Sequence, residues 1–455
     1  MNKKELEKKL ENTKDRVESV LSKSKQNGIS QVEIYVYFSE SGEVSLEKND
    51  IHASNFSEET NFGVRVIENY CEGFAATNDP DSLYESILQA KTLAISQNTP
   101  DTDLELPNPL PVVPIDGLYD ETLDDIDLEE ILQLASMCLE LRNASYENVN
   151  LDSGRFSFYK AFKHVASTKG ISQSEISGAI TANYMGMAVL GDDIGSFDYD
   201  SCESRNLSDF QKILQINYSE FLERCMGFLG SKKIESFRGN ILIPPESIFS
   251  FLGDVIGSMT AGMIRKGKSK LKDKLGKKVF SSLLSVVEEP RISGFAGSTA
   301  FDREGIPTIP KEVIAEGIVK NFFYNHYEAK KAGLKGSGGN AVGGSSAPPS
   351  CGPRQLQVSA GKTALGDILK PTQATIQIGR ISGSSDISSG EFSGVVKGGY
   401  FLKGTEKFPV KELTVSGNIY DALERISHVS KERKLIHSSS YRPHIVIEGM
   451  DITGK

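Results

Sequence analysis

The sequence predicts an α+β protein in two parts, with a mixed N-terminal half and a β-rich C-terminal half. Long amphipathic helices gather in the first half, whereas short alternating segments and Gly-Ser turns dominate from residue 279 onward. Helices and strands that are segregated along the chain indicate α+β rather than a repeating βαβ scheme. Because 455 residues exceed what one hydrophobic core usually holds, we divide the chain into regions 1–232 and 233–455.

The N-terminal region combines helices with period-two segments. Gly28 ends the first helix and aspartates cap the second. Apolar residues at every second position predict half-buried strands, because successive side chains of a strand point to opposite faces. A strand and hairpin part reaches about residue 100, and a proline-rich linker separates it from a second part at 121–232. In chain order we expect helix 3–27, strands 29–40 and 43–48, hairpin 62–79, helix 79–97, linker 98–120, helix 127–144, strands from about 148 to 200, and helix 210–229.

The C-terminal region opens with a strand at 239–245, which two prolines end, and a helix at 246–263. That helix carries an apolar stripe at helical spacing, so one face should pack on a core. Gly253 and Gly257 lie four residues apart on a neighbouring strip, where we expect another backbone to approach closely. The segment 335–355 is too rich in glycine, proline and serine for regular structure, and we interpret it as a loop.

The composition argues against several classes of protein. The formal charge is −10, so the molecule as a whole should repel nucleic acid and anionic membranes. The sequence lacks both the long apolar run of a membrane span and the apolar segment of a signal peptide. Five scattered cysteines are typical of free thiols in a reducing compartment. We therefore predict a cytoplasmic protein.

A lysine-rich segment, residues 265–278, carries eight cations and one acid. Such a run can bind nucleic acid, but it contains no aromatic residue on which a base could stack. We favour a solvated loop, or an edge strand that lysines protect from pairing. The sequence therefore does not predict binding to nucleic acid.

The usual motifs of phosphate and metal binding are missing. Residues 361–363 resemble the end of a P-loop, but Leu356 occupies the position of the required upstream glycine. No two of the six histidines lie three or four residues apart, the spacing at which helical side chains converge on zinc. His437 and His444 could meet across a hairpin, although surface or core positions are the simpler interpretation.

Several blocks of the sequence resemble the TldD/PmbA family, cytosolic proteins described as zinc metallopeptidases or as modulators of DNA gyrase. The resemblance extends from about residue 30 to 450 and includes Arg65, Phe301, Asp302 and Glu304. It implies the two-part PmbA/TldD-like architecture. The blocks that carry it are FGVRVIENYCEGFAATND, STAFDREGIPTIPKEVIAEGIVKNFFYNHYEAKKAGLKGSGG, SSDISSGEFSGVVKGGYFLKG and PVKELTVSGNIYDAL.

The family resemblance also identifies a degenerate metal site. TldD-type members carry His-Glu-x-x-x-His on a helix before an arginine-lysine-glycine segment, and a cysteine near the C-terminus completes the zinc site. Setting residues 265–267 on that segment places Gly253, Asp254 and Ser258 at the motif positions, and serines stand where the cysteine would be. Glycine has no donor atom, and a serine hydroxyl is a poor zinc ligand. The resemblance implies no catalytic residue, no metal ligand and no cofactor in this chain.

By the same resemblance, the chain is a PmbA-type (TldE-type) subunit that pairs with a zinc-bearing TldD-type subunit, or forms a homodimer when alone. It would hold extended peptide for proteolysis of unfolded or leader peptides. Gly338, Gly339 and Asn340 are the candidates for substrate contact, because strand-like peptide capture needs exposed backbone groups.

Two alternatives stay open. One is a non-proteolytic regulatory binding protein, similar to a DNA gyrase modulator, that uses the lysine-rich segment. The other is a self-sufficient hydrolase with an unrecognised serine or metal site. Salt-dependent retention on DNA would favour the first alternative, and stoichiometric zinc in the purified chain would favour the second.

Overall fold

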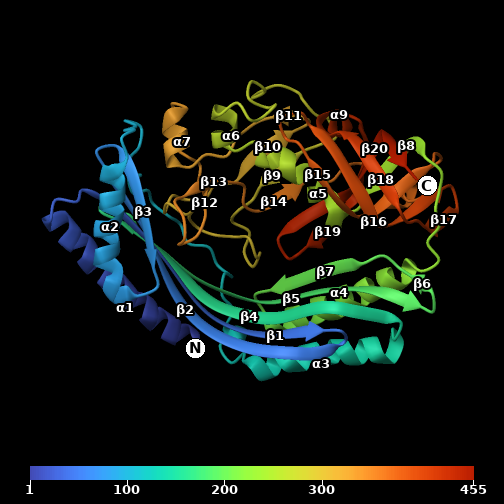
Figure 1. Ribbon diagram of the computed structural model, residues 1–455, viewed down its shortest axis with the longest axis horizontal. Coiled ribbons are helices and arrows are strands. Elements are labelled where there is room, and N and C mark those ends of the chain that lie inside the picture. Colours follow the sequence, from blue (N-terminus) through green and yellow to red (C-terminus); the bar gives the residue numbers. More distant parts are fainter. Residues whose placement is uncertain (455) are drawn as a thin grey trace.

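A long curved antiparallel sheet underlies the N-terminal half of the molecule, which the computed structural model describes over residues 1–454 (Figure 1). Its strands follow the order β3-β2-β1-β4-β5-β6, and β7 pairs with β5. Four of them are 17 to 19 residues long, so the sheet extends past a single core. The strands are β1 (Gln31–Glu47), β2 (Asp50–Glu68), β3 (Cys71–Thr77), β4 (Val149–Ser167), β5 (Ser172–Leu190), β6 (Asp193–Ile194) and β7 (Asp198–Ser204).

Helices pack against this sheet, and Figure 1 shows α1 and α3 on the side away from the C-terminal half. Asn2 caps α1 in a capping box with Glu5, and the helix ends before Gly28, as the sequence predicts. No helix within residues 1–454 is both long and apolar enough to cross a bilayer. The helices of this half are α1 (Lys3–Gln26), α2 (Leu83–Ser96), α3 (Leu128–Ser145) and α4 (Leu207–Gly227), with 3-10 turns at Pro80–Ser82 and Glu121–Leu123.

Strand β1 differs from its prediction. The sequence indicates separate strands at 29–40 and 43–48, whereas Gly42 lies inside one continuous strand. A Cβ atom at Gly42 would lie 2.3 Å from Cε1 of Phe158 on β4, so this glycine makes room for an aromatic ring and forms no turn. The pairing of β1 with β4 joins the segments before and after the linker 98–120 into one sheet.

The C-terminal sheet closes into a barrel. Its path β15-β8-β20-β18-β16 returns to its start because β16 also pairs with β15, although β15 pairs with β8 only over residues 375–377. Apolar residues of α5 (Ile248–Gly257) share one core with these strands. The strands are β8 (Phe237–Ile243), β15 (Thr375–Ser385), β16 (Glu391–Lys403), β17 (Glu406–Pro409), β18 (Leu413–Asn418), β19 (Ile426–Ile436) and β20 (Ser440–Thr453), with α9 (Ile419–Glu424) between β18 and β19.

Short elements follow α5 along the chain, before β15 begins. One small sheet has the order β11-β10-β9-β14, and the loop 335–355 contains a two-stranded ladder, β12-β13, although the sequence predicts no regular structure there. These elements are β9 (Val286–Glu288), β10 (Lys311–Ala315), β11 (Ile318–Val319), β12 (Ala341–Val342), β13 (Ser350–Cys351), β14 (Leu356–Val358), α6 (Ala261–Arg265), α7 (His326–Lys331) and α8 (Leu365–Ile368).

The helix that the sequence predicts at 246–263 is interrupted. It starts as a 3-10 turn at Pro245–Ser247, continues as α5 and ends at Gly257. Ser258 then donates its hydroxyl to the Val255 carbonyl at 2.6 Å, and the backbone turns extended at Thr260 before α6 begins. A serine hydroxyl that bonds to a backbone carbonyl competes with the helix for that acceptor, which explains the break.

A buried charge network, which we call the interdomain ion cluster, joins the two halves. It consists of Glu33, Arg65, Glu72, Arg303 and Glu304. Nη1 and Nη2 of Arg65 each donate to Oε1 of Glu304 at 3.2 Å, and Arg303 donates to Glu33 at 3.0 Å. Four of the five side chains are nearly inaccessible to solvent. This cluster therefore fixes the barrel half against β1 and β2.

Candidate functional site

The candidate site lies beside α5, the helix on which the family resemblance places a degenerate metal-binding motif. The apolar stripe of α5 packs as predicted, with Ile248, Leu252, Val255 and Ile256 all buried. Gly253 and the exposed Asp254 lie outside this stripe, and the buried Ser258 follows the last residue of the helix. The three predicted positions are thus close together in the chain but lie in different environments.

The space around the two glycines contradicts the sequence expectation. A Cβ atom built on Gly253 or Gly257 would find no atom within 4 Å in the described chain, so no backbone approaches closely there. Both residues belong to the strip beside the exposed Asp254, which faces outward from the core. The missing side chains therefore leave open space on α5 instead of a tight packing contact.

Ser258 and Asp254 have separate hydrogen-bond partners. Ser258 is fully buried, donates to the Val255 carbonyl and accepts a hydrogen bond from the Ser269 hydroxyl at 3.3 Å. Asp254 accepts a hydrogen bond from the hydroxyl of Ser385 on β15. Only Asp254 therefore presents an oxygen ligand to solvent, and a zinc ion requires several nitrogen, sulfur or oxygen donors. The residues at these positions do not fit a zinc ion.

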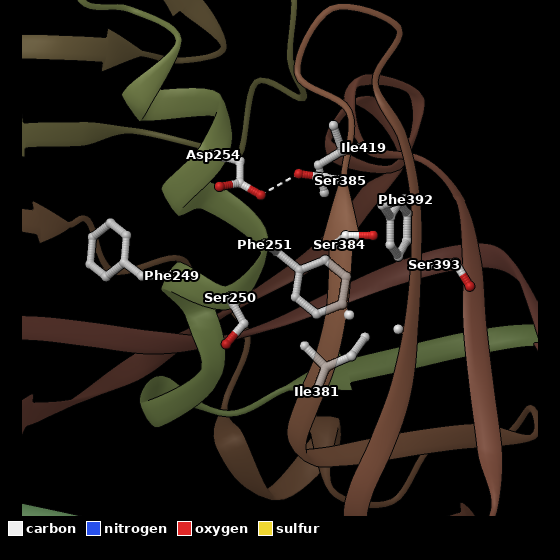
Figure 2. Close-up of a pocket in the computed structure, with 12 residues that line it drawn as sticks. Phe249, Ser250, Phe251, Asp254, Ile381, Ser384, Ser385, Phe392, Ser393 and Ile419 are labelled. Atoms are coloured by element: carbon white, nitrogen blue, oxygen red, sulfur yellow. Dashed lines mark hydrogen bonds between the residues drawn. The ribbon is translucent and has the colours of Figure 1, made fainter.

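A cavity of about 240 Å³ opens between α5 and the β15–β16 hairpin. Figure 2 shows Phe251 and Ser250 on α5, and Phe392 and Ser384 on the hairpin. The two rings are 5.7 Å apart in an edge-to-face arrangement. The complete lining is Phe249, Ser250, Phe251, Asp254, Ile381, Gly383, Ser384, Ser385, Phe392, Ser393, Gly394 and Ile419.

The chemistry of this lining suits binding better than bond cleavage. Hydroxyl groups can donate to and accept from a peptide backbone, and the phenylalanines offer apolar contact. None of the lining residues is a histidine or cysteine. In residues 1–454, no three or more His, Cys, Asp or Glu side chains form a group that could hold a metal ion.

The predicted substrate loop lies elsewhere. Gly338, Gly339 and Asn340 do not line the cavity at α5. Asn340 is fully buried, its Nδ2 donates to both carboxylate oxygens of Glu288 at 2.8 and 2.9 Å, and Lys311 donates to the Gly338 carbonyl. The Asn340 side chain therefore anchors its loop, and substrate contact by this loop stays a prediction.

The lysine-rich segment forms a solvated, turn-rich strap next to α6. All seven lysines from 266 to 278 are exposed, whereas Ser269 and Leu271 are buried and hold the strap to the core. Lys270 lies 5.2 Å from the ring centre of Tyr420, a cation–π contact. This arrangement agrees with the interpretation of a solvated loop.

The interdomain ion cluster could not be recognised as a unit from the sequence. Arg65 and Glu304 belong to two of the family-like blocks, but their contact spans 239 positions of the chain. The only sequence signal was that Glu33 and Arg65 stand within apolar, strand-like segments.

The fold of this chain is the same as that of several solved structures. TldE from Thermococcus kodakarensis superimposes with a TM-score of 0.86 at 21% identity, over 96% of this chain and 100% of that one. A proposed modulator of a DNA gyrase from Thermotoga maritima gives a TM-score of 0.85 at 21% identity, over 98% and 100%. At such identities the likeness shows the fold.

Sequence comparison defines the family. Residues 236–454 match the PmbA/TldA metallopeptidase C-terminal domain, and residues 32–94 match domain 1 of the same family. The chain belongs to the PmbA/TldA metallopeptidase family, which confirms the resemblance drawn from the sequence.

Two curated relatives show how far the similarity extends. Metalloprotease PmbA of Escherichia coli O157:H7 is 22% identical over 408 residues, which cover 86% of this chain and 85% of the relative. A metalloprotease TldD homolog of Buchnera aphidicola is 25% identical over 436 residues, covering 90% and 85%. Both branches of the family are therefore similar to this chain over most of their length.

Proposed function

We propose that this chain is a PmbA/TldE-like subunit of a TldD/TldE-type zinc metallopeptidase complex, in which it holds peptide and supports assembly but carries no catalytic group. The observation that carries the proposal is the set of side chains at the motif positions of α5. Gly253 has no donor atom, and the Ser258 hydroxyl is buried and bonded to a backbone carbonyl. Zinc ligands in proteins are mainly thiolate, imidazole and carboxylate groups, and Asp254 alone supplies one.

Peptide holding is supported by a free strand edge beside the cavity. β15 pairs with β8 only through residues 375–377, while its pairing with β16 continues to Ser385. The stretch 380–385 therefore has a strand partner on one side only within the described chain. An extended peptide could add to such an edge through main-chain hydrogen bonds, with alternate side chains entering the cavity.

The first experiment tests whether hydrolysis needs a partner. Azocasein is incubated with this chain, with a TldD-type subunit that carries His-Glu-x-x-x-His, and with both. We expect hydrolysis by the mixture alone, abolished by a chelator and by substitution of the partner's motif glutamate. Strong, chelator-insensitive hydrolysis by this chain alone would show that it carries its own active site.

A second experiment tests peptide holding at the cavity. Phe392→Ala removes one ring of the lining, and Phe408→Ala is the matched control because Phe408 lies on β17, outside the cavity. In the active mixture, we expect Phe392→Ala to raise KM several-fold with little change in kcat, because the ring would contact substrate equally before and during the reaction. Equal effects of both variants on KM would contradict the assignment.

A non-proteolytic regulatory role is the second candidate, favoured by the exposed lysines of residues 266–278. Their Lys→Gln substitution would then reduce retention on DNA, and retention would fall steeply with salt. Retention by the intact chain at physiological salt, without any activity in the mixture, would replace the first proposal with this one.

A further inference from the structure

A second cavity, of about 450 Å³, lies between the two halves of the molecule. β7 and α4 of the N-terminal half contribute one wall, and β15, β16 and the ends of β19 and β20 contribute the other. It shares none of its lining residues with the cavity at α5. Its volume is within the range of small-molecule sites, which commonly occur at such junctions.

Two clusters of charged side chains in the lining each contain two carboxylates and one cation, and so carry one excess negative charge. Arg224 donates to Asp198 at 2.8 Å and to Asp200 at 2.7 Å, so one guanidinium serves two carboxylates. Lys434 likewise contacts two carboxylates, those of Glu220 at 2.7 Å and Glu246 at 3.0 Å. The ionised groups therefore create two regions that attract a cation.

Arg380 is the opposite case, a cation without a carboxylate. Its guanidinium stacks 4.9 Å from the ring centre of Tyr199, and among residues 1–454 it has no ion-pair partner. Its Nε is buried without a hydrogen-bond acceptor, and Oε1 of Gln377, which lines the same cavity, is buried without a donor. Buried polar atoms without partners are costly, so each of these atoms is complementary to a ligand group of the opposite kind.

We propose that this cavity binds a small zwitterion, a free amino acid or a dipeptide with free termini. Its carboxylate pairs with Arg380, because a planar guanidinium binds a carboxylate with two parallel hydrogen bonds. Its ammonium group lies toward the carboxylates held by Arg224 and Lys434. Phe228 and Tyr400 line the same space and offer apolar contact to a side chain.

Isothermal titration calorimetry on the full chain tests this site with the dipeptide Ala-Phe. The carboxamide of Ala-Phe lacks the terminal negative charge, and N-acetyl-Ala-Phe lacks the terminal positive charge. We expect Ala-Phe to bind and each blocked analogue to bind about tenfold or more weakly, because charged hydrogen bonds at both ends contribute.

Arg380→Gln should weaken Ala-Phe by about tenfold or more and abolish the preference over its carboxamide. Arg238→Gln is the matched control, since Arg238 is an exposed arginine outside the cavity, and it should bind as the parent chain does. Circular dichroism melting verifies that each variant is folded. If Arg380→Gln does not fold, Arg380→Lys keeps the charge without the planar fork and should give intermediate affinity.

Equal affinity for Ala-Phe and its carboxamide, or no heat with any of the three peptides at millimolar concentration, would overturn the proposal. Binding of inorganic phosphate as tightly as Ala-Phe would also overturn it, by indicating a simple anion site. The assay needs neither a partner subunit nor turnover, so its failure would leave the proposed subunit function untouched.

Discussion

Arg65→Gln is the substitution that we expect to weaken the junction of the two halves most strongly. Arg65 lies 3.3 Å from Glu33, 3.2 Å from Glu304 and 3.6 Å from Glu72. Burial lowers the pKa of Arg65, and the three carboxylates more than offset this, so the net shift is upward and the guanidinium stays charged. Without it, three carboxylates would share the single cation of Arg303.

The expected magnitude follows from the charge balance of the interdomain ion cluster. Removing one partner of a buried ion pair costs about 3–5 kcal/mol, because the remaining charge is left uncompensated. Arg65→Gln leaves two excess carboxylates, so we expect the upper part of this range. Glu304→Gln leaves two carboxylates with two guanidinium groups, and should cost only the weakened hydrogen bonds, about 1.5–3 kcal/mol.

Equilibrium urea unfolding, followed by far-ultraviolet circular dichroism, measures both variants. Arg16→Gln is the control, because Arg16 pairs with Asp81 at the exposed surface and should change the free energy of unfolding by about 0–1 kcal/mol. The double variant of Arg65 and Glu304 should cost less than the sum of the single ones, since the two residues interact directly. A loss below about 1 kcal/mol for Arg65→Gln, or a larger loss for Glu304→Gln, would refute the charge-balance reasoning.

Three further predictions concern single features of the fold. His164 is buried and donates from Nδ1 to the Gln173 carbonyl at 3.0 Å, and burial lowers its pKa to about 4. The folded state therefore resists protonation of His164. We expect the free energy of unfolding to be constant above pH ~6.5 and to fall by up to about 3 kcal/mol toward pH 4. His164→Gln should flatten this pH profile, and identical profiles for the variant and the parent chain would contradict the prediction. Gly253→Ala should stabilise the chain by about 0.5–1 kcal/mol, because alanine favours the helix and its Cβ meets no atom within 4 Å in the described chain. A lower thermal midpoint of the variant would show that the added methyl group clashes with a neighbour. Four exposed lysines of the lysine-rich segment can be replaced by glutamine, namely Lys268, Lys270, Lys272 and Lys274. Each replacement should cost less than about 0.5 kcal/mol of the free energy of unfolding. A large drop in thermal midpoint would show that this segment is packed or paired.

Features that depend on neighbouring residues could be predicted from the sequence. The first helix ends where Gly28 adopts a left-handed conformation, and the hairpin predicted within 62–79 is present, because β2 and β3 pair around a tight turn at Asn69 and Tyr70. The family resemblance places Gly253, Asp254 and Ser258 at the motif positions, and this alignment likewise depends only on the order of residues along the chain. Local geometry and donor chemistry are properties of the chain itself, so a linear pattern is enough to indicate them.

Features that depend on distant segments were decided by the tertiary structure. Gly42 has the signature of a turn, yet Phe158, more than a hundred residues away, makes it a strand position. Asn340 lies in a glycine-rich loop, yet Glu288 and Lys311 bury and anchor it.

The same holds for the two cavities and for the open space beside Gly253. Closure of the barrel by β15 and β16 sets the cavity at α5, and the approach of β7 to the barrel sets the one around Arg380. The type of a residue determines which bonds it can form. Its burial and its partners depend on pairings between strands that are far apart in the chain. Those pairings are selected by the packing of the whole molecule, which no local pattern contains.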